Sequence, residues 1–179
     1  LQEQEQNGPI TPEPRTVPLL LRIEKAASGN AGLPFRSELI ITTAAITFPN
    51  VILNGAAQTV DGSTSAWQAN ATGESGGWKV TVASTDFDNG SGKTIAVSNF
   101  QIRLLDANIV WVSGDVNGPT STQTTFTALS GTALKIASAA VGEGNGVYDL
   151  TPDFRLTVPA ETYAGSYTAT VAVDISAGP

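Results

Sequence analysis

Side chains able to carry out catalysis are scarce in this chain of 179 residues, which contains no histidine, no cysteine and no methionine. Histidine-based triads, thiolate metal sites and disulfides are therefore excluded. The acidic residues Asp149, Asp153 and Glu161 could be considered as a carboxylate pair for glycoside hydrolysis, but no local pattern supports that chemistry. We expect a protein that is not an enzyme and has no cofactor.

One acidic segment, TDFDNGSG, brings Asp86, Asp88 and Asn89 close together in the sequence. Oxygen ligands at this density can bind calcium. The segment lacks the spaced glycine and the glutamate of an EF-hand loop, and Asp, Asn and Gly are also the residues that turns require. We expect a solvated turn, with calcium at Asp86 and Asp88 as the alternative and no other metal site.

Charge and hydropathy limit the partners. The net charge is −7 with nine Lys and Arg residues, whereas nucleic-acid binding needs clustered basic residues. No apolar run reaches the ~18–20 residues that span a bilayer. Because the chain begins at Leu1 and lacks methionine, we expect a processed, secreted protein at the cell surface or outside the cell.

The N-terminal region divides into three parts. Residues 1–15 are rich in Gln, Glu and Pro and form a polar arm that cannot bury itself. Residues 16–25 alternate as a strand, and residues 26–34 form a linker, so that 16–34 precedes a domain over 35–179. Four apolar residues share one side of the strand: Val17, Leu19, Leu21 and Ile23.

The rest of the chain has the pattern of an all-β protein. Alternating apolar residues predict strands around Trp78, Phe154 and Tyr167, and the stretch 128–140 reads as strand or short helix. Asn-Gly pairs predict tight turns at 54–55, 89–90, 117–118 and 145–146. We expect a single antiparallel β-sandwich, of Greek-key, immunoglobulin-like or jelly-roll-like type. Alternation places the side chains of Trp78 and Trp111 in its core.

Two stretches, 46–82 and 150–179, resemble the WxL-type domain of bacterial secreted surface proteins, over about residues 37–179. The proximal motif is matched by Gly77-Trp78-Lys79-Val80-Thr81, with Gly77, Trp78, Val80 and Thr81 as its key positions. The distal motif corresponds to Val173-Asp174-Ile175, without its tryptophan. The resemblance implies an exported β-sandwich that adheres non-covalently to cell-wall glycan.

The N-terminal strand and its linker resemble, in layout, the donor strand of TasA-like biofilm fibre subunits. A sandwich with an open edge accepts such a strand by main-chain hydrogen bonds and side-chain pockets, and head-to-tail insertion yields filaments. Full burial of Val17, Leu19, Leu21 and Ile23 would contribute ~6–12 kcal/mol before ordering costs. Pairing within its own sandwich, as the first strand, is the commoner use of such a segment. The sequence thus predicts a self-polymerising extracellular subunit, with wall adhesion as the alternative.

Overall fold

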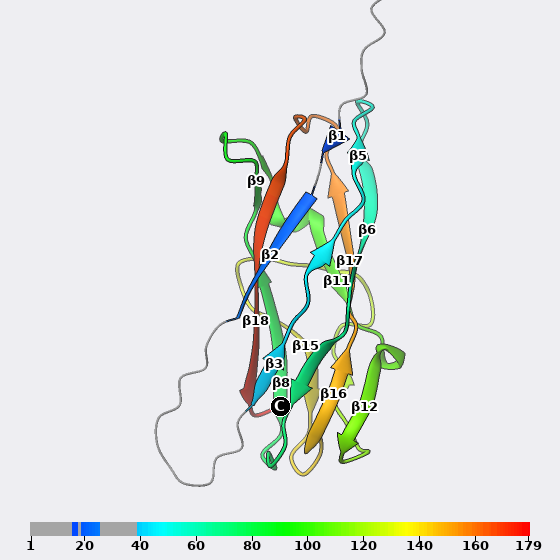
Figure 1. Cartoon of the computed structure of the whole chain (residues 1–179), viewed down its shortest axis with the longest axis vertical. Coiled ribbons are helices and arrows are strands. Elements are labelled where there is room, and N and C mark those ends of the chain that lie inside the picture. The colour runs from blue at the N-terminus through cyan, green and yellow to red at the C-terminus, as the bar shows by residue number, and fades with distance from the viewer. Residues whose placement is uncertain (1–15, 18, 26–38) are drawn as a thin grey trace, which may run out of the picture.

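The computed structural model describes the backbone of residues 16–17 and 19–25 and all atoms of residues 39–179. The expected arm 1–15 and linker 26–34 lie outside these residues. The described chain is an all-β sandwich (Figure 1), as the sequence predicts. Its elements are β1 (Thr16–Val17), β2 (Leu19–Lys25), β3 (Ile40–Thr42), β4 (Ile46–Thr47), β5 (Val51–Ile52), β6 (Gln58–Thr64), β7 (Trp67–Asn70), β8 (Trp78–Ser84), β9 (Phe87–Asp88), β10 (Thr94–Ile95), η1 (Val97–Asn99), β11 (Phe100–Arg103), η2 (Asp106–Asn108), β12 (Ile109–Gly114), β13 (Thr120–Ser121), β14 (Thr127–Ala128), β15 (Leu134–Ala139), β16 (Gly146–Leu150), β17 (Asp153–Val158) and β18 (Tyr167–Ala177).

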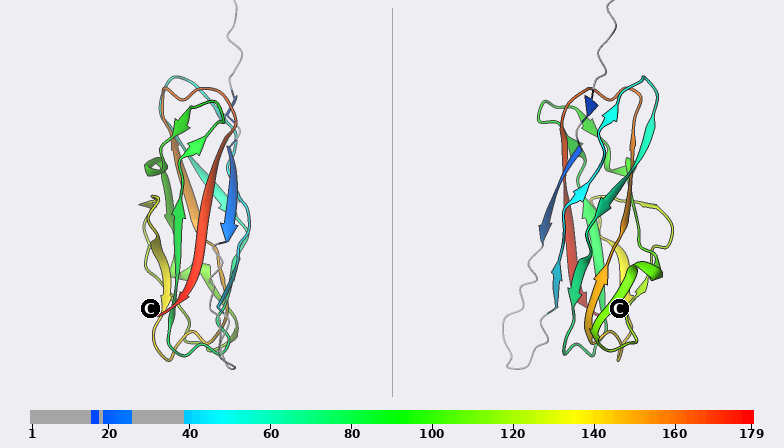
Figure 2. Two further views of the ribbon diagram at one scale, coloured as in Figure 1. Left: turned by 90° about the vertical axis from the view of Figure 1, so that its left-hand side faces the viewer. Right: turned by 45° about the vertical axis from the view of Figure 1, so that its right-hand side comes forward.

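The sandwich has two layers, which the rotated views of Figure 2 show edge-on and from the side. The first layer has the strand order β13-β15-β8-β18, with the β9-β10 hairpin beside β18. The second layer has the order β4-β6-β17-β11-β14 in one half of the molecule and β3-β7-β16-β12 in the other. The two orders correspond strand for strand, because β3 leads into β4, β6 into β7, β11 into β12 and β16 into β17 along the chain.

The strands of the second layer are therefore long strands interrupted near their middle. The interruptions fall at 43–45, 65–66, 104–108 and 151–152, between the paired members of the two halves. The loop at 104–108 contains η2, whose last residue, Asn108, donates from its side chain to the Thr151 carbonyl at 3.0 Å. These breaks explain why the structure has more, and shorter, strands than the alternation in the sequence suggests.

Alternation in the sequence correctly predicts the core. Every second residue is buried in β8 from Trp78, in β17 from Phe154 and in β18 from Tyr167 to Ile175. Phe87 of the first layer lies 5.3 Å from Phe100 of the second in an edge contact, and Phe100 stacks 5.6 Å from Phe154 within the second layer. Such pairs add about 0.5–1.5 kcal/mol each beyond area burial.

The Asn-Gly prediction is correct for two of four pairs. Gly55 and Gly90 have positive φ angles of 78° and 74° in turns. Gly118 and Gly146 have no positive φ, and close packing explains them instead. A Cβ on Gly146, the first residue of β16, would lie 2.2 Å from the Ser113 carbonyl oxygen, and one on Gly118 would lie 2.5 Å from Cε1 of Tyr148.

The ambiguous stretch 128–140 is strand rather than helix, since it contains the end of β14 and all of β15. Only two 3-10 turns of three residues each represent helix in the described part of the chain. No helix among the described residues is long and apolar enough to cross a membrane.

Candidate functional site: the β2 slot

The predicted donor segment occupies a slot between the two layers, which we call the β2 slot and define by its walls, β18 and β4. β2 lies beside β18 over its whole length and meets β4 at one residue pair, Leu20 with Thr47. The β2–β18 ladder is parallel, whereas every other strand pair among the described residues is antiparallel (Figure 1). Parallel ladders are slightly less stable per residue than antiparallel ones.

The register of β2 matches the predicted apolar side. Its backbone pairs Leu19 with Tyr167, Leu21 with Ala169 and Ile23 with Val171. These three β18 partners have buried side chains. The backbone register therefore sets three of the predicted donor positions beside buried positions of β18.

The fourth donor position, Val17, belongs to β1, where its backbone pairs with Val51 of β5. The expected single strand 16–25 is thus two strands, β1 and β2, and Pro18 between them lies outside the described residues. Both strands pair with the same chain. This is the intrachain arrangement that the sequence left open beside donation.

Both walls of the slot are held independently of β2. β18 also pairs with β8 from Val171 to Ala177, and β4 pairs with β6 through Ile46 and Thr47. The Tyr167 hydroxyl at the start of β18 donates to the Tyr163 carbonyl at 3.1 Å. The slot is therefore bounded by the edge of β18 from Tyr167 to Val173, and a strand edge of this kind can pair with an extended backbone.

The WxL-like residues lie in the first layer and are part of the core. Trp78 and Val80 are fully buried, and the Trp78 indole N–H donates to the Gly144 carbonyl at 2.9 Å. Gly77 has a φ of 75°, and a Cβ there would lie 2.7 Å from the Ala139 carbonyl oxygen. Burial of Trp78 agrees with the prediction from alternation.

The structure brings the two WxL-like segments together as neighbouring strands. Residues Val80 and Thr81 of β8 pair with Ile175 and Asp174 of β18. β18 thus pairs with the proximal motif strand at its C-terminal end and with β2 at its N-terminal end. The strand that carries the WxL-like motif, β8, and the predicted donor strand, β2, therefore both pair with β18.

The prediction that Trp111 lies in the core is wrong. Its side chain is 50% exposed, while Trp67 and Trp78 are completely buried. Trp111 has the alternation of a core residue, but β12 is the outermost strand of its sheet, so no neighbouring strand covers it on that side. Alternation reports the face of a sheet, not the distance from its edge.

The carboxylates of Asp86 and Asp88, the alternative calcium ligands, both accept hydrogen bonds from backbone N–H groups. Asp86 accepts from the Val97 N–H at 2.7 Å, and Asp88 accepts from the Gly90 N–H. Within the described ranges, no three His, Cys, Asp or Glu residues gather as a metal-binding group. Asp86 and Asp88 therefore act as turn-forming residues.

The three acidic residues considered for hydrolysis do not form a site together. Asp153 is bound by Arg103 at 2.9 Å, and Asp149 accepts from the Gln68 side-chain amide at 3.2 Å. Glu161 lies in the exposed loop after β17. No local sequence signal linked them, and the pocket described below is lined by none of the three.

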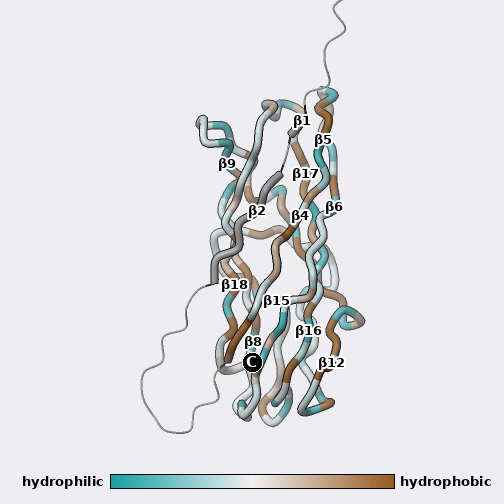
Figure 3. The backbone as a smooth tube through the Cα atoms, in the orientation of Figure 1, coloured by the Kyte–Doolittle hydropathy of each residue, from teal (hydrophilic) through white to brown (hydrophobic). Residues whose placement is uncertain are grey.

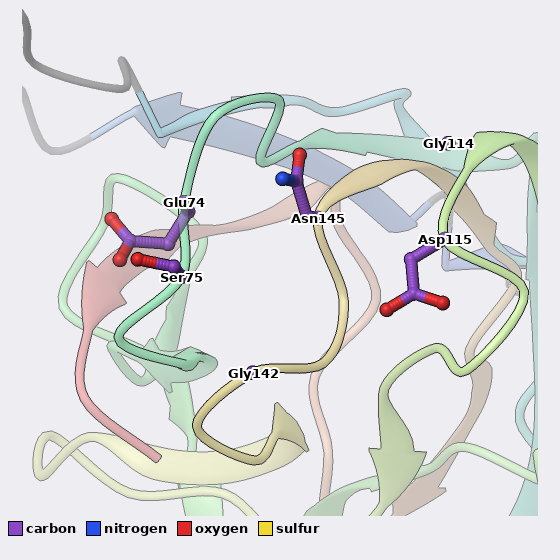
Figure 4. A pocket seen from close by; sticks show the side chains of 6 residues that line it. All are labelled: Glu74, Ser75, Gly114, Asp115, Gly142 and Asn145. Atoms are coloured by element: carbon purple, nitrogen blue, oxygen red, sulfur yellow. The ribbon is translucent and has the colours of Figure 1, made fainter.

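A pocket that the sequence did not predict lies among the loops near the start of β8 (Figure 4). Its polar groups already serve the loops: the Asn145 side chain accepts from the Gly73 N–H at 2.8 Å, and Asp115 accepts from the Asn117 N–H at 3.0 Å. The lining residues come from three separate loops and are Glu74, Ser75, Gly114, Asp115, Gly142 and Asn145. Only the folded structure assembles them.

Comparison with known proteins identifies no family. The chain matches no protein-family model and no curated protein sequence. A solved structure of a family 123 glycoside hydrolase from Clostridium perfringens, studied for glycolipid glycan hydrolysis, is 18% identical over 69% of this chain, with a TM-score of 0.37. The match spans 19% of that protein's length. A likeness this low carries no argument about activity.

Proposed function

We propose that this protein is a secreted, non-catalytic structural subunit that polymerises head-to-tail into an extracellular filament by exchanging β2 between neighbouring copies. In the filament, the β2 slot of each copy holds residues 19–25 of the next. Because each copy gives one strand and receives another through different surfaces, the contact is heterologous and does not close.

One observation carries the proposal: β2 is joined to its own domain by a parallel ladder with β18 and by a single residue pair with β4. The antiparallel pairings on the far side of both walls do not involve β2. β2 is followed by residues 26–38 before the continuous domain begins. At about 3.5 Å per residue, these residues can span up to roughly 45 Å, enough to reach an adjacent molecule.

The energetics of exchange favour a concentration-dependent equilibrium. The same β2–β18 and β2–β4 pairings exist in the closed monomer and in the polymer, so most of their free energy cancels between the two states. The free-energy difference between the closed monomer and the polymer then depends on the conformation of the linker and on the entropy lost on association. Swapping identical elements is for this reason a low-cost route to assembly.

The alternative function, adhesion to cell-wall glycan through the WxL-like segment, has less support. Trp78 is the aromatic residue on which that interpretation depends, and its indole is fully buried and hydrogen-bonded to Gly144. A buried indole offers no surface on which a sugar ring can stack.

A reversible disulfide tests strand exchange directly. Arg22 and Thr170 pair in register, and adjacent strands place paired Cα atoms at a separation that a disulfide can bridge. The double variant Arg22→Cys, Thr170→Cys therefore locks β2 in its own slot when oxidised as a monomer. We expect no filaments by negative-stain electron microscopy until reductant is added, and filaments afterwards.

The matched control places the same cross-link elsewhere in the first layer. Lys79 of β8 and Ser176 of β18 also pair in register, so Lys79→Cys, Ser176→Cys joins two strands without restraining β2. This variant should polymerise whether oxidised or reduced. Filaments formed by the oxidised Arg22–Thr170 variant, after mass spectrometry confirms the intrachain disulfide, would disprove exchange of β2.

A further inference from the structure

A second self-association surface lies on β12, at the other end of the second layer from the β2 slot. β12 is the outer strand of the order β12-β16-β7-β3, so within the described chain it pairs on one side only. Its apolar side chains are exposed, with Val110 at 53%, Trp111 at 50% and Val112 at 44%. Figure 3 shows this strand as a hydrophobic stretch on the outside of the molecule.

The hydrogen-bond pattern shows which backbone groups of β12 are free. The Thr151 N–H donates to the Asn108 carbonyl, so Asn108 faces β16. Bonded and non-bonded positions alternate in an antiparallel ladder, and Val110 therefore also faces β16. On the side away from β16, Trp111 therefore presents its N–H and C=O and Ile109 presents its C=O, while the Ile109 N–H donates to the Asp106 carbonyl of η2.

The free edge ends sharply after Trp111. The pairing with β16 shifts by one residue between Trp111 and Ser113, which is a β-bulge. The Trp111 indole N–H also donates to the Gly114 carbonyl at 3.3 Å. The edge available to another strand is therefore the short segment from Ile109 to Trp111.

Apart from the bulge, this segment has none of the residues that usually protect an edge strand, since residues 107–114 contain no charge and no proline. The other free edges of the described sheets are short: β13 and β14 have two residues each, and β3 has three. β12 has six residues, of which Ile109 to Trp111 form the available edge. Among these outer strands only β12 exposes large apolar side chains, so the best-matched strand that a second copy offers is its own β12.

We propose that two copies of this protein associate through their β12 edges, antiparallel and about a two-fold axis at Val110. In this register Ile109 of each copy forms the bonded pair with Trp111 of the other, and Val110 lies opposite Val110. The Trp111 N–H of each copy then donates to the free Ile109 carbonyl of the other, which gives two hydrogen bonds across the axis. The result is one continuous sheet of eight strands.

The side chains favour a second copy over an unrelated strand. The two-fold register pairs an aromatic residue with a β-branched one at both ends and two valines at the centre, which are the stabilising cross-strand combinations. No like charges face each other within the pairing, although the protein carries a net charge of −7. The contact is isologous, so it closes at a dimer.

Cysteine cross-linking tests this register, because the natural chain has no cysteine. In the full-length variant Val110→Cys, the two thiols lie opposite each other at a non-bonded pair, with Cβ atoms ~4.5–5.5 Å apart. Under mild oxidation we expect a covalent dimer to form roughly tenfold or more faster than in the control Val116→Cys, because pairing raises the local thiol concentration. Val116 is 75% exposed and lies outside β12.

A charge variant provides the second test. Val110→Lys places two ammonium groups opposite each other on the axis, whereas Val116→Lys makes the same charge change away from it. By sedimentation equilibrium at high protein concentration, we expect dimers for wild type and Val116→Lys, and their loss for Val110→Lys. Circular dichroism verifies that each variant is folded, which the exposure of both valines favours.

The outcomes separate this proposal from strand exchange. Each chain of the Val110→Cys variant has one thiol, so denaturing gels show at most a dimer even from a filament. Equal cross-linking rates at positions 110 and 116, or unchanged dimerisation of Val110→Lys, would overturn the β12 pairing and leave the exchange of β2 unaffected. Conversely, the oxidised Arg22–Thr170 lock should still dimerise through β12.

Discussion

Trp78 and Gly144 are held together by a buried hydrogen bond of 2.9 Å, in which the indole N–H donates to the glycine carbonyl. Gly144 has a φ of 74°, and a Cβ at this position would lie 2.8 Å from the indole nitrogen and 2.4 Å from the Ala139 Cβ. The loop before β16 thus depends on a residue with no side chain to approach the largest side chain of β8. The WxL-like segment is consequently a packing element of the first layer.

Replacing Gly144 with Ala should destabilise the protein for two reasons. The left-handed conformation costs a non-glycine residue about 1–2 kcal/mol, and the overlap with the Ala139 side chain adds about 1–3 kcal/mol. Urea unfolding followed by tryptophan fluorescence measures the total.

The control for this change is Gly142→Ala in the same loop. Gly142 also has a positive φ, of 82°, but a Cβ there would meet open space. Its replacement should cost only the conformational part, about 1–2 kcal/mol. Equal losses for the two variants would show that the contact with Trp78 is not tightly packed.

The two tryptophans of β8 and β12 should respond very differently to truncation. Trp78→Ala removes a fully buried indole and should lower the unfolding free energy by ~3–5 kcal/mol. Trp111→Ala removes a half-exposed one and its hydrogen bond to the Gly114 carbonyl, and should lower it by only about 1–2 kcal/mol. Thermal unfolding at low protein concentration, where copies do not associate, measures both. A Trp78→Ala variant that kept the wild-type melting temperature would contradict its place in the core.

The contrast between these tryptophans shows how far the sequence predicts the fold. Alternation places Trp78 and Tyr167 correctly, because a two-residue period determines which face of a sheet is buried. It fails for Trp111, because the period contains no information about which strand is outermost. Strand order depends on pairing between residues far apart in the chain, such as Tyr167 with Leu19.

The candidate site was predictable in part for the same reason. The apolar side of residues 16–25 is visible in the sequence, but the parallel pairing with β18 is not. Long-range side-chain contacts were also missed, such as the Phe126 ring held between Arg103 at 4.5 Å and Arg155 at 4.1 Å. Nothing in the local sequence around Phe126 indicates two guanidinium partners from other strands.

Alkaline pH should weaken the fold through Tyr148. Burial raises the pKa of its phenol above the ordinary value near 10, and the Asp115 charge raises that pKa further. In the unfolded chain the phenol ionises at its ordinary pKa. The stability linked to Tyr148 is therefore complete below about pH 10 and is lost as the pH rises through the higher folded-state pKa.

Urea midpoints measured between about pH 9 and pH 11 test this linkage. We expect the midpoint to fall with pH in the wild type, and to fall less steeply in Tyr148→Phe. That variant should also be less stable at neutral pH, because it loses the hydrogen bond from the hydroxyl to the Asp115 carbonyl. Val116→Ala, a change at the exposed residue next to Asp115, should keep the wild-type slope of midpoint against pH. Identical slopes for Tyr148→Phe and wild type would refute the assignment.

A peptide of residues 14–27, added to the full-length protein, should shorten the filaments if β2 is exchanged between copies. The peptide presents the same backbone and apolar positions as β2 but carries no domain, so a slot that receives it ends the chain of subunits. The control is the same peptide with Leu19→Asp and Leu21→Asp. These positions pair with Tyr167 and Ala169, whose side chains are buried, and burying an unpaired carboxylate costs several kcal/mol.

Filament lengths from negative-stain images should decrease with the dose of the natural peptide and not with the Asp peptide. Filaments of unchanged length with both peptides would mean that β2 does not leave its slot.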